Sequence, residues 1–226
     1  MTQHAGLGTT QIVKWDRIED VLLDMDGTLL DRHFDNYFFE EELPRRYASR
    51  HDLSLETARE RLMAMYRSVE GELAWTDLNY WSQQVGIDVV KMHKELDHLV
   101  AFLPDAVPFL ESLRTRGKRV TIVTNAHASG VDVKCAKTGL NRYVHRIVDA
   151  FQVGFLKMRP EYWPNCQRLV GFDPDRSLYI DDDEACLTAA RGFGVAHLFH
   201  RSKSSSQLPP APSAMFPSIE RFHVLM

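Results

Sequence analysis

The sequence contains no long hydrophobic run, little cysteine and no excess of basic charge. It never approaches the roughly 18 consecutive apolar residues of a transmembrane helix, and residues 1–15 contain no apolar core of a signal peptide. Its 3 cysteines are odd in number and lack metal-ligand spacing, which favours free thiols in a reducing compartment. The formal net charge of −4 gives no support for binding to nucleic acid or acidic membranes. We therefore expect a cytoplasmic protein without a nucleic-acid or membrane partner.

The composition is that of a globular protein with a full hydrophobic core. Of the 226 residues, 44% are hydrophobic, and this length is compatible with one or two domains. No internal repeat is visible. The composition therefore does not indicate a function, whereas particular motifs do.

The most informative segment is 21–31, in which a short apolar run ends in two aspartates. Residues 21–23 are Val-Leu-Leu, as expected of a buried parallel strand, and Asp24 and Asp26 then fall on one side of the extended chain. Ligands bind beyond the carboxyl ends of strands in open α/β sheets, so this segment predicts two acids at a site. An acidic turn is the simpler alternative. A calcium loop of the EF-hand type does not fit, because Gly27 follows the second aspartate directly.

Further polar groups follow later predicted strands. The strand predicted at 119–123 ends in Thr124 and Asn125, Lys157 follows a short loop, and the strand predicted at 177–180 runs into aspartates 181–183. Adjacent carboxylates repel one another and are costly unless a cation or a helix N-terminus compensates their charge. Taken singly, a Thr-Asn pair is typical of a turn and a lysine of a solvated surface. Their common placement at strand ends favours one shared site.

The ordered set Asp-x-Asp-Gly-Thr, Thr-Asn, Lys and Asp-Asp resembles the motifs of the haloacid dehalogenase superfamily, over residues 21–199. This resemblance implies an α/β fold with a doubly wound, Rossmann-like parallel sheet and an inserted α-helical cap. The implied catalytic core is 1–31 and 104–226, and the implied cap is 32–103. Helical spacing of apolar residues within 55–69, 78–85 and 90–102 agrees with a helical insertion.

The resemblance also implies a magnesium-dependent phosphatase. Asp24 is expected to attack phosphorus and form an aspartyl-phosphate, while Asp26 protonates the leaving oxygen and later deprotonates water. Lys157 and Mg²⁺ are expected to neutralise the repulsion between phosphate and nucleophile. Thr124 and Asn125 are expected to bind the phosphoryl oxygens. The implied metal ligands are Asp24, Asp182 and the backbone carbonyl of Asp26, with Asp181 behind them.

The substrate is indicated by a narrower resemblance. Residues 34–38 (Phe-Asp-Asn-Tyr-Phe) and 78–82 (Leu-Asn-Tyr-Trp-Ser) resemble segments of the bacterial GMP/IMP nucleotidase branch. This implies a small phosphomonoester, a purine 5′-monophosphate, whose base Asp35 or Asn36 can read through hydrogen bonds. The aromatic residues of these segments favour cap core over a stacking platform, because aromatic side chains dominate core packing.

Three alternatives remain open at this stage. A phosphoglycolate or sugar-phosphate phosphatase keeps the chemistry and changes the substrate. A phosphomutase shares both aspartates but must protect its phosphoenzyme from water. A non-catalytic phosphate-binding regulator retains only the site. The sequence does not indicate an oligomeric state.

The sequence also predicts helix ends and the character of the C-terminal tail. Ser54 is the predicted N-cap of the helix in 55–69, and Asp105 of a core helix that ends at Gly117. The Ser- and Pro-rich stretch 202–212 predicts a surface loop or connector. The apolar residues of 215–226 would allow that segment to pack back on the core.

Overall fold

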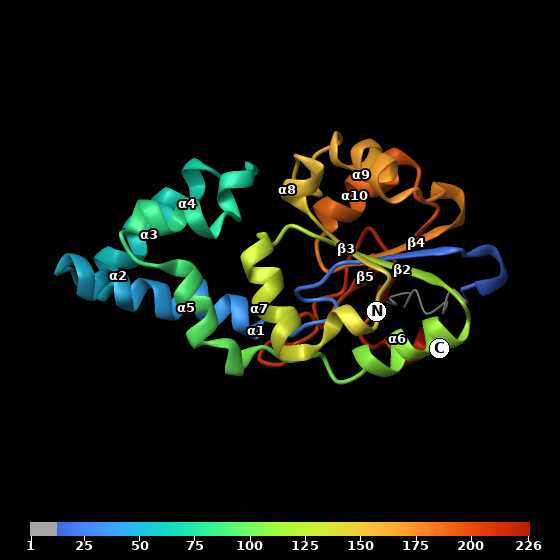
Figure 1. The fold of residues 1–226 in the computed structure, drawn as a ribbon, viewed down its shortest axis with the longest axis horizontal. Helices are drawn as coiled ribbons and strands as arrows, with labels where there is room; N and C mark the ends of the chain where they lie inside the picture. The colour runs from blue at the N-terminus through green and yellow to red at the C-terminus, as the bar shows by residue number, and fades with distance from the viewer. Residues whose placement is uncertain (1–12) are drawn as a thin grey trace, which may run out of the picture.

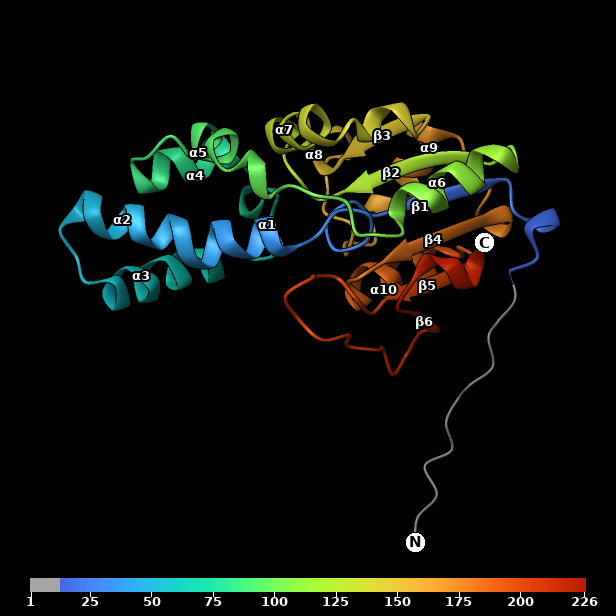
Figure 2. The ribbon, with the colours of Figure 1, turned by 90° about the horizontal axis from the view of Figure 1, so that it is seen from below.

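The computed structural model describes residues 13–226, so the prediction for residues 1–15 falls almost entirely outside the described residues. Six parallel strands form one sheet in the order β3-β2-β1-β4-β5-β6. Figures 1 and 2 show this sheet with helices on its faces. The strands are β1 (Asp20–Leu23), β2 (Arg119–Thr124), β3 (Arg146–Asp149), β4 (Ser177–Asp181), β5 (His197–Arg201) and β6 (Ser218–Ile219). The predicted α/β class with a parallel sheet is confirmed.

Strand β1 lies in the interior of the sheet and is buried on both faces. Val21 and Leu23 belong to one hydrophobic cluster and Leu22 to another, because successive side chains of a strand point to opposite faces. Leu23 pairs with Ile122 of β2 and with Ile180 of β4. The three strands are therefore in register, and their carboxyl ends lie at the same level.

Helices cover both faces of the sheet, which makes it doubly wound. Helices α8 (Ala150–Val153), α9 (Tyr162–Val170) and α10 (Glu184–Phe193) lie on one face, where Trp163 and Leu187 pack in the cluster of Leu22. Helix α6 (Ala106–Thr115) lies on the opposite face, in the cluster of Val21. Helix α7 (Ala128–Thr138) follows β2. None of the described helices has the length and apolar character needed to cross a membrane.

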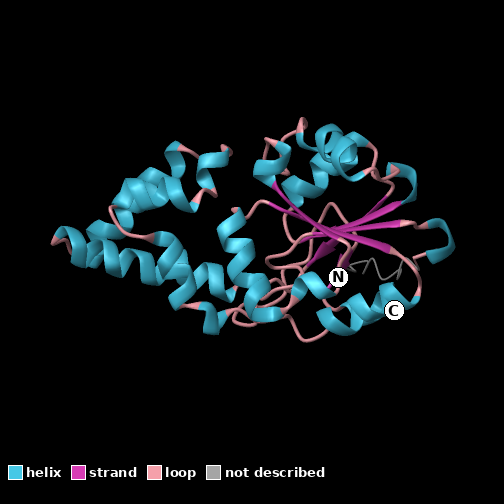
Figure 3. Ribbon diagram, viewed as in Figure 1, coloured by secondary structure: helices cyan, strands magenta, loops and turns pink. Residues whose placement is uncertain are grey.

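The chain between β1 and α6 forms a helical block beyond the carboxyl ends of the strands (Figures 2 and 3). Its helices are α1 (His33–Asn36), a π-helical turn (Tyr37–Glu42), α2 (Leu43–His51), α3 (Leu55–Ser68), α4 (Leu78–Val85) and α5 (Val89–Glu95). Ser54 caps α3 as predicted, since its hydroxyl accepts a hydrogen bond from the amide of Thr57. The assignment of 32–103 to a separate cap domain stays a prediction.

The helix predicted at 90–102 is wrong in its second half. Helix α5 ends at Glu95, and a 3₁₀ turn at Asp97–Leu99 follows it. Beyond this turn the backbone is extended, because Phe102 forms an antiparallel bridge with Leu30 and the carbonyl of Ala101 accepts from the amide of Asp31. The segment that leads back to the sheet therefore pairs with the segment that leaves it after β1. This pairing satisfies backbone N–H and C=O groups that would be paired within a helix if the helix continued.

The role predicted for Asp105 is also wrong. Asp105 precedes α6, but its carboxylate does not cap the helix. It accepts hydrogen bonds from the guanidinium of Arg201 and from the amide of Phe222. The ring of Phe222 stacks on Phe109 of α6 with centroids 4.2 Å apart. The C-terminal segment therefore packs back on the core, and Asp105 joins that segment to α6 and β5.

Candidate active site

The carboxyl ends of three neighbouring strands bring the predicted site residues together. Asp24 follows β1, Thr124 ends β2, and Asp181 ends β4. Since these strands are parallel and in register, residues far apart in sequence lie at one edge of the sheet. All three side chains are buried.

Lys157 joins two of these carboxylates. Its backbone amide donates to Oδ1 of Asn125 (2.8 Å), and its carbonyl accepts from the indole of Trp163 (3.1 Å), which holds the loop between α8 and α9. Its ammonium lies 2.5 Å from Asp24 Oδ1 and 2.7 Å from Asp181 Oδ2. Burial by itself lowers the pKa of Lys157, but the two carboxylates outweigh burial and hold this pKa well above its usual value.

Asp181 is held by further hydrogen bonds. The hydroxyl of Tyr179 donates to its Oδ2, and the amide of Asp183 donates to its Oδ1 (2.8 Å). Burial raises the pKa of Asp181 to about 6, against the opposing effect of Lys157. The carboxylate is therefore fixed in position and shares its cation with Asp24.

Three carboxylates form a cluster suited to a hard cation. Asp24, Asp181 and Asp182 each offer an oxygen, and these oxygens lie within 4.8 Å of one another. Oδ2 of Asp24 is buried and has no hydrogen-bond partner among residues 13–226. Burial and the charges of Asp24 and Asp181 raise the pKa of Asp182 well above its usual value. A divalent cation would satisfy the unpartnered oxygen and relieve the repulsion, so these residues fit a metal that prefers oxygen ligands.

Gly27 allows the loop after β1 to pass close to Asp182. Its φ angle is +91°, a left-handed conformation that side chains disfavour. A Cβ atom at this position would lie 2.3 Å from Oδ2 of Asp182. The same Oδ2 is 2.8 Å from the guanidinium of Arg32, which sequence reasoning did not identify.

A second lysine in the site was also not predicted. Lys134 of α7 is buried, and its ammonium lies 2.8 Å from Asp26 Oδ1 and 2.9 Å from Asp35 Oδ1. The contact with Asp26 lacks hydrogen-bond alignment and is an ion pair, whereas both oxygens of Asp35 accept hydrogen bonds. The available sequence signal was helical spacing, because Lys134 lies on the buried face of α7 with Gly130 and Val133.

These groups line one cavity of about 840 Å³ between the sheet edge and the helical block. The predicted residues on its wall are Asp24, Asp26, Asp35, Asn36, Thr124, Asn125, Lys157, Asp181 and Asp182. Its far wall is formed by residues of the helical block, among them Phe39, Arg59, Tyr66, Trp75 and His93. Trp81 and Phe38 are fully buried. These two aromatic side chains are therefore core, as predicted.

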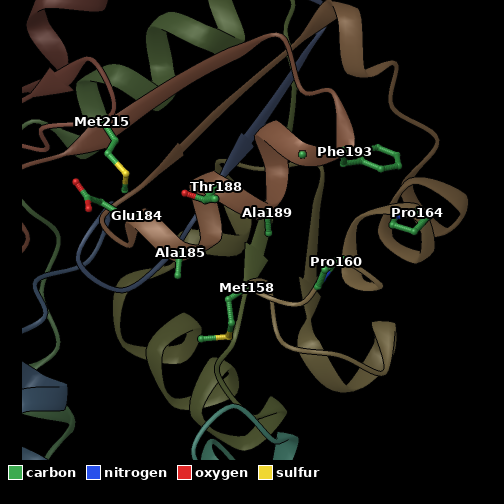
Figure 4. A pocket seen from close by; sticks show the side chains of 10 residues that line it. Met158, Pro160, Pro164, Glu184, Ala185, Thr188, Ala189, Phe193 and Met215 are labelled. Carbon is green, nitrogen blue, oxygen red and sulfur yellow. The ribbon is translucent and has the colours of Figure 1, made fainter.

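A second cavity, of about 810 Å³, lies along α10 (Figure 4). Met158, Pro160, Pro164, Phe193 and Met215 contribute to its lining, and its wall contains one carboxylate, that of Glu184. It contains no cluster of titratable groups comparable with the one at the sheet edge. The chemistry of the described residues is thus concentrated in the first cavity.

Comparisons with known proteins agree with this geometry. The family model described as haloacid dehalogenase-like hydrolase matches residues 19–194. The chain is 33% identical to the GMP/IMP nucleotidase YrfG of Escherichia coli (strain K12) over 214 residues, which cover 95% of this chain and 96% of the relative. It is 27% identical over 108 residues to a glyceraldehyde 3-phosphate phosphatase of Methanopyrus kandleri, covering 47% of this chain and 46% of the relative.

A solved structure with the same fold is that of a HAD phosphatase from Thermococcus onnurineus. Its TM-score is 0.73 at 21% sequence identity, with 91% of this chain and 95% of that chain covered. The family model spans more than half of the chain and includes all of the carboxylates and lysines at the sheet edge. The chain belongs to the haloacid dehalogenase-like hydrolases.

Proposed function

We propose that the protein is a magnesium-dependent phosphatase that hydrolyses purine 5′-monophosphates, of the GMP and IMP type, through a phosphoaspartyl intermediate. The observation that carries the chemistry is the buried carboxylate of Asp24, which shares Lys157 with Asp181 and keeps one oxygen unpartnered among the described residues. The similarity to a GMP/IMP nucleotidase over 95% of the chain supports the substrate.

In this proposal Asp24 attacks phosphorus and displaces the alcohol oxygen of the substrate. Asp26 gives that oxygen its proton and later removes a proton from the water that hydrolyses the aspartyl-phosphate. Lys157 offsets the repulsion between the incoming phosphate and the nucleophile. Thr124 and Asn125 bind the phosphoryl oxygens. The backbone N–H of Lys157 donates a hydrogen bond to Oδ1 of Asn125 and thereby orients the Asn125 side-chain amide.

Asp24, Asp182 and the backbone carbonyl of Asp26 would hold a magnesium ion, and Asp181 would support Asp24 through the Lys157 ammonium that they share. Magnesium, when bound, supplies positive charge that stabilises the transferring phosphoryl group. The unpartnered Oδ2 of Asp24 and the close approach of the three carboxylates support this assignment. The raised pKa of Asp182, which burial and neighbouring carboxylates cause, supports it as well.

The size and the lining of the cavity support a substrate larger than phosphate alone. Its volume of about 840 Å³ is within the range of small-molecule sites, and aromatic residues of the helical block form part of its wall. Asn36 lines this cavity and is our candidate for reading the base. Asp35 also lines it, but both of its carboxylate oxygens are bonded to Lys134, so we do not give it that role.

A smaller phosphomonoester is the second candidate. The partial similarity to a glyceraldehyde 3-phosphate phosphatase favours a triose phosphate or another sugar phosphate, but it covers only 47% of this chain. Phosphoglycolate and a phosphomutase reaction stay as further alternatives. A non-catalytic regulator is disfavoured by the presence of both aspartates, both lysines and the acidic cluster in one cavity.

The test is phosphate release from GMP, IMP, AMP, pyrimidine monophosphates, sugar phosphates and phosphoglycolate, each with magnesium and with EDTA. We expect magnesium-dependent release that is fastest on GMP and IMP. Release confined to sugar phosphates or phosphoglycolate would contradict the substrate and keep the chemistry. Full activity in EDTA would contradict the metal.

A substitution at the nucleophile tests the covalent mechanism. Asp24→Asn removes the attacking oxygen with little change in shape, so phosphate release should fall at least about a thousandfold. Asp132→Asn, at an exposed aspartate of α7, is the matched control and should retain activity. Substantial turnover by Asp24→Asn would exclude an aspartyl-phosphate on this residue.

A further inference from the structure

Lys134 is a buried cation between two carboxylates that belong to different parts of the chain. Only 3% of its side chain is exposed. Asp26 lies in the loop after β1, and Asp35 lies in α1, where the helical block begins. The ammonium is 2.8 Å from Asp26 Oδ1, and 2.9 and 3.0 Å from the two oxygens of Asp35. It also lies 5.3 Å from the ring centre of Phe34.

A lysine at this position is costly for the fold alone. Removing an ammonium from water costs several kcal/mol, which a carboxylate partner only partly offsets, and an apolar side chain of similar volume is often as stable. The other buried residues of α7 are Gly130 and Val133, which are uncharged, so helix packing alone does not require a cation at this position. Its placement against Asp26 therefore points to a role in the chemistry of the site.

The two lysines contact different carboxylates of the site. The ion pairs of Lys157 run to Asp24 and Asp181, whereas those of Lys134 run to Asp26 and Asp35. Asp26 thus forms its ion pair with a different lysine from the one that contacts the nucleophile. This division separates the attacking carboxylate from the carboxylate that handles the proton.

The contact with Lys134 distinguishes the two oxygens of Asp26. Oδ1 is buried against the ammonium, and 19% of the Asp26 side chain is exposed on the wall of the cavity. Among residues 13–226, the ion pair of Asp26 with Lys134 is made through Oδ1 and not through Oδ2. The ion pair therefore draws Oδ1 toward Lys134 and leaves Oδ2 without an ion-pair partner among the described residues.

We propose that Lys134 is a positioning residue, which anchors Asp26 through Oδ1 so that Oδ2 meets the leaving oxygen of the substrate. Asp35 acts through Lys134 by holding its ammonium from the other side. This inference rests on the proposed function, because it assumes that Asp26 transfers the proton. Proton transfer by Asp26 would then depend on a contact between the sheet edge and the helical block.

The test compares two leaving groups in single-turnover reactions with enzyme in excess. A nucleoside leaves as an alkoxide and needs a proton, whereas p-nitrophenolate leaves without one. In Lys134→Met we expect nucleoside release from GMP to slow about a hundredfold and p-nitrophenolate release to slow less than about threefold. Asp26→Asn should show the same selectivity, and the double variant should be no slower than Asp26→Asn alone. The enzyme concentration that gives the half-maximal single-turnover rate with GMP should be unchanged.

Lys137→Met is the matched control, because Lys137 is an exposed lysine one turn further along α7. It should release both leaving groups at the wild-type rate. Equal slowing of both leaving groups in Lys134→Met, or no slowing of either, would overturn the inference. If Lys134→Met does not fold, Asp35→Asn decides by the same criterion, since it removes the second anchor of the ammonium.

The outcomes separate this inference from the proposed function. If the wild-type protein releases neither leaving group, or Asp24→Asn remains active, the proposed function fails. If Asp26→Asn is selective for the leaving group and Lys134→Met is not, the function stands and the positioning role is wrong.

Discussion

Gly27 combines a strained backbone conformation with a close approach to the acidic cluster. Its positive φ lets the chain turn immediately after Asp26, and its missing side chain leaves room for the carboxylate of Asp182. Sequence reasoning singled out Gly27 only by its place directly after Asp26. It could not identify the contact with Asp182, because that contact joins loops 155 residues apart in the chain.

We predict that Gly27→Ala lowers both stability and metal binding. The backbone strain should cost about 1–3 kcal/mol in the free energy of unfolding. Because the new methyl group would displace Asp182, phosphate release should also need more magnesium. Urea denaturation and a magnesium titration of activity measure the two effects.

Gly171→Ala is the matched control for this prediction. Gly171 has a φ of +79°, and a Cβ there would meet nothing within 4 Å. Gly171→Ala should lower the free energy of unfolding without changing the magnesium requirement of phosphate release. An unchanged magnesium requirement in Gly27→Ala would show that Asp182 is not displaced.

At the scale of elements, single helices were predicted better than the segments that join them. Ser54 and the apolar spacing after it are enough to start α3, since capping and amphipathic spacing act within a few residues. The segment after α5 was predicted wrongly, and so were the hydrogen-bond partners of the Asp105 carboxylate, although Asp105 does lie at the N-terminus of α6. Both depend on partners remote in sequence. Phe102 pairs with Leu30, and Asp105 bonds to Arg201.

The Arg201–Asp105 pair leads to a prediction about how α6, β5 and the C-terminal segment are joined. Only 2% of the Arg201 side chain is exposed, and its Nη2 lies 2.7 Å from Asp105 Oδ1. Asp105→Ala leaves this buried cation without its carboxylate, so the free energy of unfolding should fall by about 3–5 kcal/mol. Urea denaturation measures the loss.

An exposed ion pair serves as the comparison. Nη1 of Arg176 lies 2.8 Å from Oε1 of Glu19, but about half of each side chain is exposed, at 48% for Arg176 and 52% for Glu19. Glu19→Ala should therefore cost no more than about 1 kcal/mol. A similarly small loss in Asp105→Ala would mean that water reaches Arg201 and replaces the carboxylate.

At the scale of the whole molecule, His93 lies where the helical block meets the core. Its ring packs against Phe34 and Phe38, and Gly130 of α7 lies next to its imidazole. Neither ring nitrogen has a hydrogen-bond partner among the described residues. Burial, with Lys134 and His127 nearby, lowers the pKa of His93 to about 3.

This lowered pKa predicts a loss of stability in acid. In the unfolded chain His93 takes up a proton near its usual pKa of 6.5, whereas in the folded protein it stays neutral down to about 3. Between these values the unfolded state binds one more proton, so stability falls with falling pH by about 1.4 kcal/mol per unit. His93→Phe removes this contribution and should lose about 2 kcal/mol less than wild type between pH ~7 and ~5.

Urea denaturation at the two pH values measures the difference. His98→Gln, at an exposed histidine just beyond α5, is the control and should follow the wild type. Equal pH dependence in wild type and His93→Phe would mean that His93 is protonated in the folded protein.

The sequence by itself determined the class of fold and the place of the candidate site. Apolar strands that end in Asp24, in Thr124 and Asn125, and in Asp181 indicate both, because a buried parallel strand and the polar group at its end are adjacent in the chain. Only the tertiary structure decided which charges share a partner. Lys134 reaches Asp26 across 108 residues, since α7 packs beside the loop after β1, and such pairing depends on helix packing that no local pattern encodes.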